Sequence, residues 1–194
     1  MPIALTSRFR EALGRICEIH SAQRRKLHGE PYVSHLLRVG GMVLEWAEDE
    51  DTVLAALLHD AAEDQGGEAM LAEISADFGE HTALLVRQCS DSLTPKGEEN
   101  KAPWRERKEK YIVQVANAEP GAKLIALCDK IDNARSILSE LSIKGSDLYQ
   151  QFHGGREIHW YFRSMLEALE DGPPVLVAEL RRIVEGLDEL GARV

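Results

Sequence analysis

The clearest fold signal in this chain is the stretch Leu124-Ile125-Ala126-Leu127-Cys128-Asp129-Lys130-Ile131-Asp132-Asn133-Ala134-Arg135-Ser136. Short polar side chains recur in it at positions i, i+3, i+4 and i+7, the spacing of one helix face: Asp129, Asp132, Asn133 and Ser136. Apolar side chains can occupy the opposite face: Leu124, Leu127, Ile131, Leu138 and Leu141. The pattern predicts a helix over about residues 122–142 with one buried and one polar face.

The same helical spacing continues in both directions from this stretch. No Asn-Gly or Asp-Gly turn separates alternating apolar runs, so the usual signals for strands are missing. Helices are expected over about residues 6–24, 34–46, 51–64, 67–78, 80–92, 103–117, 122–142, 156–170 and 175–190. The segment from Leu93 to Pro103 is expected to be a loop. We therefore predict an all-α fold, a single bundle of about 8–10 helices.

Size and charge limit the classes of function. The 194 residues fit one domain spanning residues 1–194. Lys and Arg number 23 against 33 Asp and Glu, and the net charge of −10 argues against sequence-independent binding of nucleic acid or of an anionic membrane. The longest apolar runs, such as Val53 to Leu58, are far shorter than the ~18 residues of a membrane span, and Met1 to Arg10 lacks a signal-peptide core. We expect a cytoplasmic protein.

Titratable side chains interrupt an apolar helix at Leu57-Leu58-His59-Asp60-Ala61-Ala62-Glu63-Asp64. His59 and Glu63 are four residues apart, as are Asp60 and Asp64, so each pair shares one flank of a helix and can converge on one pocket. The alternative is a frayed helix end with solvated carboxylates. The polar face of residues 122–142 can likewise be an ordinary solvent-exposed helix face. Its short acidic and amide groups, however, suit ligation better than the Lys and Glu that usually occupy such a face.

A third polar segment is Gln23-Arg24-Arg25-Lys26-Leu27-His28-Gly29-Glu30-Pro31-Tyr32-Val33-Ser34-His35. Consecutive cations in an acidic chain favour binding of a phosphate group, because guanidinium and ammonium groups are its natural partners. An ordinary cationic surface, with a structural His35, is the alternative. The basic stretch from Arg105 to Lys110 is either a partner surface or a solvated helix in which Glu106 pairs with Lys110.

These motifs together resemble a known family. His20-x-x-Gln23-x-Arg25-Lys26, Pro31-Tyr32-x-x-His35, His59-Asp60-x-x-Glu63-Asp64 and Asp129-x-x-x-Asn133 occur in the order and approximate spacing of the RelA/SpoT hydrolase domain. That domain is an all-helical metallohydrolase of the HD superfamily. The resemblance covers about residues 8–169 and is closest to the stand-alone bacterial small alarmone hydrolases, which lack synthetase and regulatory domains.

The resemblance implies a set of site residues. In the family, two His and two Asp side chains hold a catalytic divalent ion, usually Mn²⁺, and the matching residues here are His35, His59, Asp60 and Asp129. Glu63 and Asp64 match carboxylates that orient or activate the attacking water. Arg25, Lys26 and Asn133 match nucleotide contacts, with Ser136 near the same substrate. This mixed N/O donor set suits manganese, iron, cobalt or zinc better than magnesium.

The resemblance also implies a reaction: removal of the 3′-diphosphate of (p)ppGpp or (p)ppApp, giving pyrophosphate and the 5′ nucleotide. The partner is then a small nucleotide. Alternatives are a 2′-phosphatase for NADPH, another HD nucleotide phosphohydrolase, and a non-catalytic nucleotide-binding module. Leu36 replaces the usual Pro after the first metal ligand, which changes a helix start but no ligand. One extra residue lies between Lys26 and Gly29, which leaves the choice of nucleobase open.

Overall fold

The computed structural model describes residues 3–94 and 102–194. Within these ranges the chain forms ten α-helices and two 3₁₀ segments: α1 (Ser7–Ile19), α2 (Val33–Trp46), α3 (Glu50–Leu58), α4 (Ala61–Gln65), α5 (Gly67–Phe78), α6 (Glu80–Cys89), α7 (Trp104–Ala116), α8 (Pro120–Lys144), η1 (Gly145–Gln151), η2 (Gly155–Glu157), α9 (Ile158–Ala168) and α10 (Pro174–Gly191). The predicted all-α bundle of about 8–10 helices is confirmed. Of the loop expected from Leu93 to Pro103, residues 95–101 lie outside the described residues.

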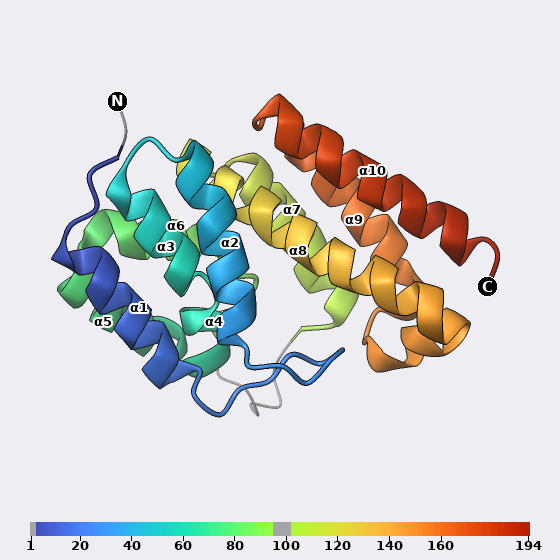
Figure 1. Ribbon diagram of the computed structural model, residues 1–194, viewed down its shortest axis with the longest axis horizontal. Helices are drawn as coiled ribbons and strands as arrows, with labels where there is room; N and C mark the ends of the chain where they lie inside the picture. Colours follow the sequence, from blue (N-terminus) through green and yellow to red (C-terminus); the bar gives the residue numbers. More distant parts are fainter. Residues whose placement is uncertain (1–2, 95–101) are drawn as a thin grey trace.

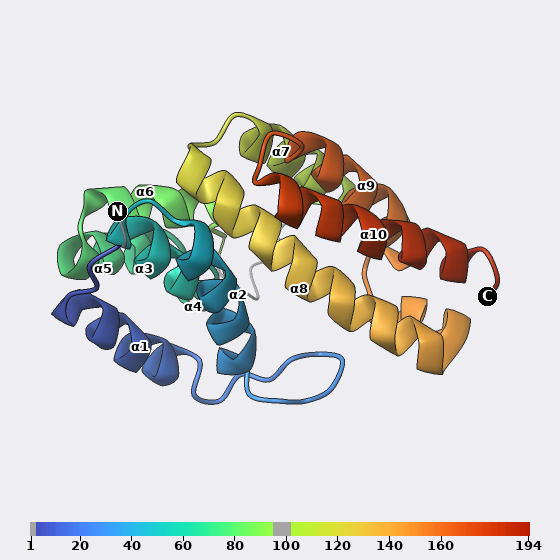
Figure 2. The same ribbon diagram turned by 45° about the horizontal axis from the view of Figure 1, so that its top comes forward.

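Helix α8 is the central element of the bundle. Figures 1 and 2 show it running between two groups of helices, with α1–α6 on one side and α7, α9 and α10 on the other. Both flanks contribute to one hydrophobic core, so α8 is buried on more than one face. Even its polar residues Asp129, Lys130 and Asp132 are less than 9% exposed. Of the predicted polar face, Asp129 and Asp132 are therefore interior, and Asn133 and Ser136 are half-buried.

Local signals explain where the helices begin. The side chain of Thr6 accepts a hydrogen bond from the backbone N–H of Arg8 and caps α1, and Pro120 supplies the fixed φ of the first turn of α8. The helix expected from residue 51 begins one residue earlier, at Glu50. Asp49 caps this helix, with its carboxylate accepting from the backbone N–H of Thr52 at 2.7 Å, and Asp51 lies in the first turn.

Two helices end earlier than the apolar pattern predicts. The first helix stops at Ile19, and the chain then forms a loop closed by the backbone bridge between Arg24 and Pro31. The helix expected over residues 51–64 breaks after Leu58, and α4 begins only at Ala61. The break places His59 and Asp60 in the turn between the two helices, at the C-terminal end of the buried α3.

The core contains few polar side chains. Val39 and Val43 of α2 pack with Leu54 and Leu58 of α3 at zero exposed fraction, and α10 contributes Leu180 from the other flank. Among the helices of the described ranges, none combines the length and apolar composition needed to cross a bilayer. Buried ionisable groups are concentrated where α2, α8 and the α3–α4 turn meet, and this concentration marks the candidate active site.

Candidate active site

Four side chains predicted as metal ligands converge at the junction of α2, α8 and the α3–α4 turn. The Nε2 atom of His35 lies 3.2 Å from Oδ1 of Asp129 and 3.5 Å from Oδ2 of Asp60. The Nε2 atom of His59 lies 3.1 Å from that Asp60 oxygen and 3.8 Å from the same Asp129 oxygen. We call these residues, His35, His59, Asp60 and Asp129, the His/Asp cluster. The structure therefore brings together residues from positions almost 100 apart in the sequence.

Each imidazole of the cluster is held through its other nitrogen. The Nδ1 atom of His59 donates to the backbone carbonyl of Ala56 at 2.8 Å, and Nδ1 of His35 lies 2.6 Å from Oδ2 of Asp132. Both Nε2 atoms are consequently directed into the cluster. Nε2 of His59 is buried and makes no hydrogen bond to any residue that the structure describes. A buried ring nitrogen that no protein group satisfies is expected where the nitrogen binds a metal ion. These residues therefore fit a divalent cation.

The field at the cluster favours positive charge. Burial alone would lower the pKa of His35, yet hydrogen bonds to Asp129, Asp132 and Asp60 raise it to about 9. The pKa of His59 is raised well above its usual value in spite of complete burial, because Asp60 and Asp129 face it. The pKa values of Asp60 and Asp129 are held well below normal against the same burial. Carboxylates so arranged stabilise a cation placed among them.

Ligand atoms of His35, His59 and Asp129 lie within 4.8 Å of one another, and all three residues are buried. Asp60 Oδ2 completes the set, and it accepts a hydrogen bond from the hydroxyl of Tyr32 at 2.6 Å. The divalent-metal site expected from the sequence thus has a geometric counterpart in this fold.

The two carboxylates of α4 lie beside the cluster with different neighbours. Oε2 of Glu63 accepts from the backbone N–H of Asp91 at 3.2 Å, and burial together with the charge of Asp91 raises the pKa of Glu63 to about 8. Oδ2 of Asp64 accepts from Nε2 of Gln23 at 2.5 Å. At neutral pH Glu63 therefore holds a proton.

A cavity of about 610 Å³, here called the main cavity, opens beside these groups. Three of the predicted substrate contacts, Arg25, Lys26 and Asn133, line it. Nη2 of Arg25 donates to Oδ1 of Asn133 at 2.9 Å, which holds the guanidinium at the cavity wall. Ser136 is not among the described lining residues, and its hydroxyl donates to the carbonyl of Asp132 in its own helix at 3.0 Å.

Three further cations line the main cavity and were not assigned from the sequence: Arg107, Lys108 and Lys130. Asp91 accepts from Nη1 of Arg107 at 2.7 Å and from Nζ of Lys108 at 2.5 Å, so one buried carboxylate fixes two cations. Lys130 is buried and pairs with Asp129. The six Lys and Arg among the described lining residues outnumber three acidic ones, which makes the cavity suited to an anion.

The signal for Lys108 was present in the helix periodicity. Trp104, Lys108, Tyr111 and Val115 share one stripe of α7, and Tyr111 and Val115 are buried. The remaining charges of the Arg105–Lys110 stretch pair at the surface, where Nζ of Lys110 lies 2.7 Å from Oε1 of Glu106. This basic stretch is therefore divided between the cavity and a solvated face.

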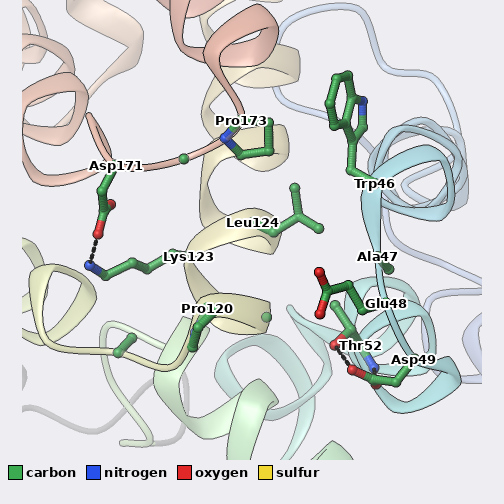
Figure 3. Close-up of a pocket in the computed structure, with 13 residues that line it drawn as sticks. Trp46, Ala47, Glu48, Asp49, Thr52, Pro120, Lys123, Leu124, Asp171 and Pro173 are labelled. Carbon is green, nitrogen blue, oxygen red and sulfur yellow. Dashed lines mark hydrogen bonds and ion pairs between the residues drawn. The ribbon is translucent and has the colours of Figure 1, made fainter.

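A second cavity of about 330 Å³ lies near the N-terminal end of α8 (Figure 3). Its lining lysine, Lys123, points to Asp171, with Nζ 2.6 Å from Oδ2. Asp49 caps α3 and accepts a hydrogen bond from the hydroxyl of Thr52. The only group of metal-ligating side chains found among the described residues is the one at the His/Asp cluster. The main cavity is accordingly the candidate active site.

Comparisons with known proteins agree with this geometry. The family model for the HD domain matches residues 12–158. The guanosine-3′,5′-bis(diphosphate) 3′-pyrophosphohydrolase of Mus musculus is 36% identical over 121 residues, which are 61% of this chain and 63% of that protein's length. The enzyme of the same name from Drosophila melanogaster is 35% identical over 135 residues, covering 68% of this chain and 70% of its own.

A solved structure described as a metazoan orthologue of SpoT that hydrolyses ppGpp superposes with a TM-score of 0.75 and 27% identity. The superposition covers 97% of this chain and 98% of that one, so the similarity of fold extends beyond the matched motifs. On the strength of the family match and of the shared fold, this chain belongs to the HD domain family and is a homologue of the guanosine-3′,5′-bis(diphosphate) 3′-pyrophosphohydrolases.

Proposed function

We propose that this protein is a metal-dependent hydrolase of guanosine alarmones that removes the 3′-diphosphate of (p)ppGpp and releases pyrophosphate and the 5′ nucleotide. The observation that carries the proposal is the position of the His/Asp cluster beside a cavity with a cationic lining. A metal-binding group next to an anion-binding wall is the arrangement that phosphoryl hydrolysis requires. The relatives from Mus musculus and Drosophila melanogaster bear the name of this reaction.

One divalent ion would be held by His35, His59, Asp60 and Asp129, and Mn²⁺ fits this mixed set of nitrogen and oxygen donors. Such an ion lowers the pKa of a water molecule and polarises a phosphoryl oxygen. The protein's part is to fix the ligands: Tyr32 orients Asp60, and Ala56 orients His59. Nδ2 of Asn133 donates to Oδ1 of Asp129 at 2.5 Å and orients that carboxylate in turn.

The two carboxylates of α4 suit complementary proton transfers. Asp64 can accept a proton from the attacking water, because its carboxylate is fixed by Gln23 beside the cluster. Glu63 is protonated at neutral pH and can donate to the leaving pyrophosphate. A pair of carboxyl groups with separated pKa values is the usual basis for dividing the roles of base and acid.

The lining of the main cavity suits a nucleotide with phosphates at both ends of its ribose. Arg25 and Lys26 lie on the loop that follows α1, and Lys108 and Lys130 lie on α7 and α8, so cations approach the cavity from separate elements. The hydroxyl of Tyr161 also lines this cavity and is buried without a hydrogen-bond partner among the described residues. It is available to the substrate. We assign the nucleotide contacts to Arg25, Lys26 and Asn133, which line the cavity, and Ser136 stays a prediction of the family resemblance alone.

Product analysis tests this proposal. Metal-stripped protein would be incubated with ppGpp, pppGpp, pppApp or NADPH, with and without Mn²⁺, and the products separated by anion-exchange chromatography. We expect Mn²⁺-dependent pyrophosphate together with GDP from ppGpp and GTP from pppGpp. Asp60→Ala serves as the control for contaminating hydrolases and should form neither product.

Other products would replace the proposal. Pyrophosphate from pppApp alone would assign an adenosine alarmone as substrate, and inorganic phosphate from NADPH alone would assign a 2′-phosphatase. No turnover of any of the four compounds by protein with bound Mn²⁺ would contradict an alarmone hydrolase and favour a nucleotide-binding module.

A further inference from the structure

Asp132 is a buried carboxylate that contacts the His/Asp cluster without belonging to it. Its Oδ2 atom lies 2.6 Å from Nδ1 of His35, and the two side chains are 3% and 1% exposed. Asp132 follows Asp129 by three residues on α8, so both carboxylates project from the same face of one rigid helix. One helix therefore meets His35 from both sides, with Asp129 at Nε2 and Asp132 at Nδ1.

The hydrogen bond to Asp132 determines the state of His35. A carboxylate can only accept, so the proton shared with Asp132 lies on Nδ1 of the imidazole, and Nε2 is the nitrogen that faces the cluster and would bind a metal ion. His59 reaches the same orientation through the neutral carbonyl of Ala56. The Asp132 carboxylate is charged, whereas the Ala56 carbonyl is neutral. The charge makes the imidazole of His35 a stronger electron-pair donor to a metal ion.

Asp132 is itself held in place by cations. Nε of Arg38 donates to its Oδ1 atom and Nη2 of Arg38 donates to Oδ2 at 3.2 Å. Arg38 lies on α2 one turn after His35, so the contacts of Asp132 with both residues join α2 to α8. Nη2 of Arg25 lies 3.6 Å from Oδ2 of Asp132, which brings the loop after α1 to the same carboxylate.

We propose that Asp132 is a positioning residue of the metal centre, which fixes the tautomer and the orientation of His35 and is held for this purpose by Arg38. This inference rests on the proposed function, because it assigns a role relative to the metal that the His/Asp cluster would hold. Asp132 is neither a member of the His/Asp cluster nor one of the residues that line the main cavity, so it acts on the metal centre through His35.

Metal affinity tests this inference directly. Mn²⁺ would be titrated into metal-stripped wild-type protein and into Asp132→Ala, Asp132→Asn and Glu140→Ala by isothermal titration calorimetry. Glu140 is the matched control, because it is a buried carboxylate of the same helix that pairs with Lys144 and His28 and touches no cluster residue. Unfolding temperature in the absence of metal would be measured for each variant.

Loss of a carboxylate that orients a ligand commonly weakens metal binding by about 10–100-fold. We expect a loss of this size for Asp132→Ala, a smaller loss for Asp132→Asn, whose amide oxygen still accepts from Nδ1, and no change for Glu140→Ala. In Zn²⁺-loaded protein, long-range ¹H–¹⁵N spectra should show the Nδ1–H tautomer of His35 in the wild type and lose this signature in Asp132→Ala.

A folded Asp132→Ala protein with the wild-type Mn²⁺ dissociation constant would overturn the inference, even if its unfolding temperature fell. Should that variant not fold, wild-type affinity in Asp132→Asn would overturn it equally. Failure of the wild-type protein to bind Mn²⁺ is a separate outcome, which contradicts the proposed metal centre and with it the basis of this inference.

Discussion

At the scale of single residues, neighbouring carboxylates of this site have opposite electrostatic environments. Arg107 and Lys108 counteract burial at Asp91 and hold its pKa at about 2. Burial raises the pKa of Glu63 to about 8, and the charge of Asp91 adds to this effect. Asp91 is therefore a fixed anion, and its neighbour Glu63 is a carboxyl group that is neutral at pH 7.

The raised pKa of Glu63 predicts a falling stability of the metal-free protein between about pH 4.5 and pH 8. In this range the folded protein binds a proton at Glu63 that the unfolded chain has released, so the free energy of unfolding decreases as pH rises, by up to about 1.4 kcal/mol per pH unit. Glu63→Gln should flatten this slope. Urea denaturation across the range measures it, with Glu68→Gln as a surface control, and an unchanged slope in Glu63→Gln would contradict the assignment.

Removing a proton donor and removing a metal ligand should have different signatures. Glu63→Gln is expected to lower kcat for ppGpp by about 10²–10⁴-fold while leaving Mn²⁺ affinity unchanged, because Glu63 contacts Asp91 instead of the cluster. Asp60→Ala should lose both Mn²⁺ binding and activity. Steady-state kinetics and metal titration on the two variants separate these effects, and equal loss of metal binding in both would refute the division of roles.

At the scale of helices, the position of His35 depends on a close approach of α2 to α3. A Cβ atom built on Gly40 would lie 2.7 Å from Cδ2 of Leu57, which is only 2% exposed. The next residue, Gly41, has no such neighbour within 4 Å and is exposed. The two glycines of α2 therefore serve different purposes, the first allowing close packing and the second contributing only flexibility.

These adjacent glycines provide a matched prediction. In Gly40→Ala, overpacking should lower the free energy of unfolding by about 1–3 kcal/mol. The better helix propensity of Ala offsets about 1 kcal/mol of this loss. Gly41→Ala should raise it by about 0.5–1 kcal/mol. Denaturant unfolding of the two variants measures the difference. Equal effects would mean that α2 and α3 are not packed as described.

The sequence predicted most helices because apolar spacing and helix ends are local. The bounds of α5, Gly67–Phe78, were predicted without error, since Gly79 with φ of 91° ends it. The break between α3 and α4 was missed because an apolar pattern with helical spacing runs through it. The cationic lining from α7 was missed for another reason. Lys108 lies on the same face of α7 as the buried Tyr111, and it is held by Asp91, a contact across 17 residues that the local pattern does not show.

At the scale of the whole molecule, the proposed metal ligands join parts of the chain that are remote in sequence. His35 lies in the first turn of α2, His59 and Asp60 form the α3–α4 turn, and Asp129 lies near the middle of α8. The family resemblance identified these residues, and the fold explains why they meet. The contribution of Asp132 could not be identified from the sequence, because a polar stripe on α8 does not reveal which helix covers it.

Binding of an ion that joins three segments should stabilise the entire fold. At a free Mn²⁺ concentration 100 times the dissociation constant, the gain is about 2.7 kcal/mol, which corresponds to an increase in unfolding temperature of about 5–10 °C for a chain of this size. Asp60→Ala should show no increase. Calorimetric scans with Mn²⁺, with chelator and with Mg²⁺ test this, and an equal increase in Asp60→Ala would place the ion elsewhere.

The most direct test of the account is the position of the metal. Crystals of the metal-stripped protein soaked in Mn²⁺ would be measured on both sides of the manganese absorption edge. We predict one anomalous peak bounded by Nε2 of His35, Nε2 of His59, Oδ2 of Asp60 and Oδ1 of Asp129. No peak at that point, or a single peak at another place in the molecule, would contradict the proposed metal centre.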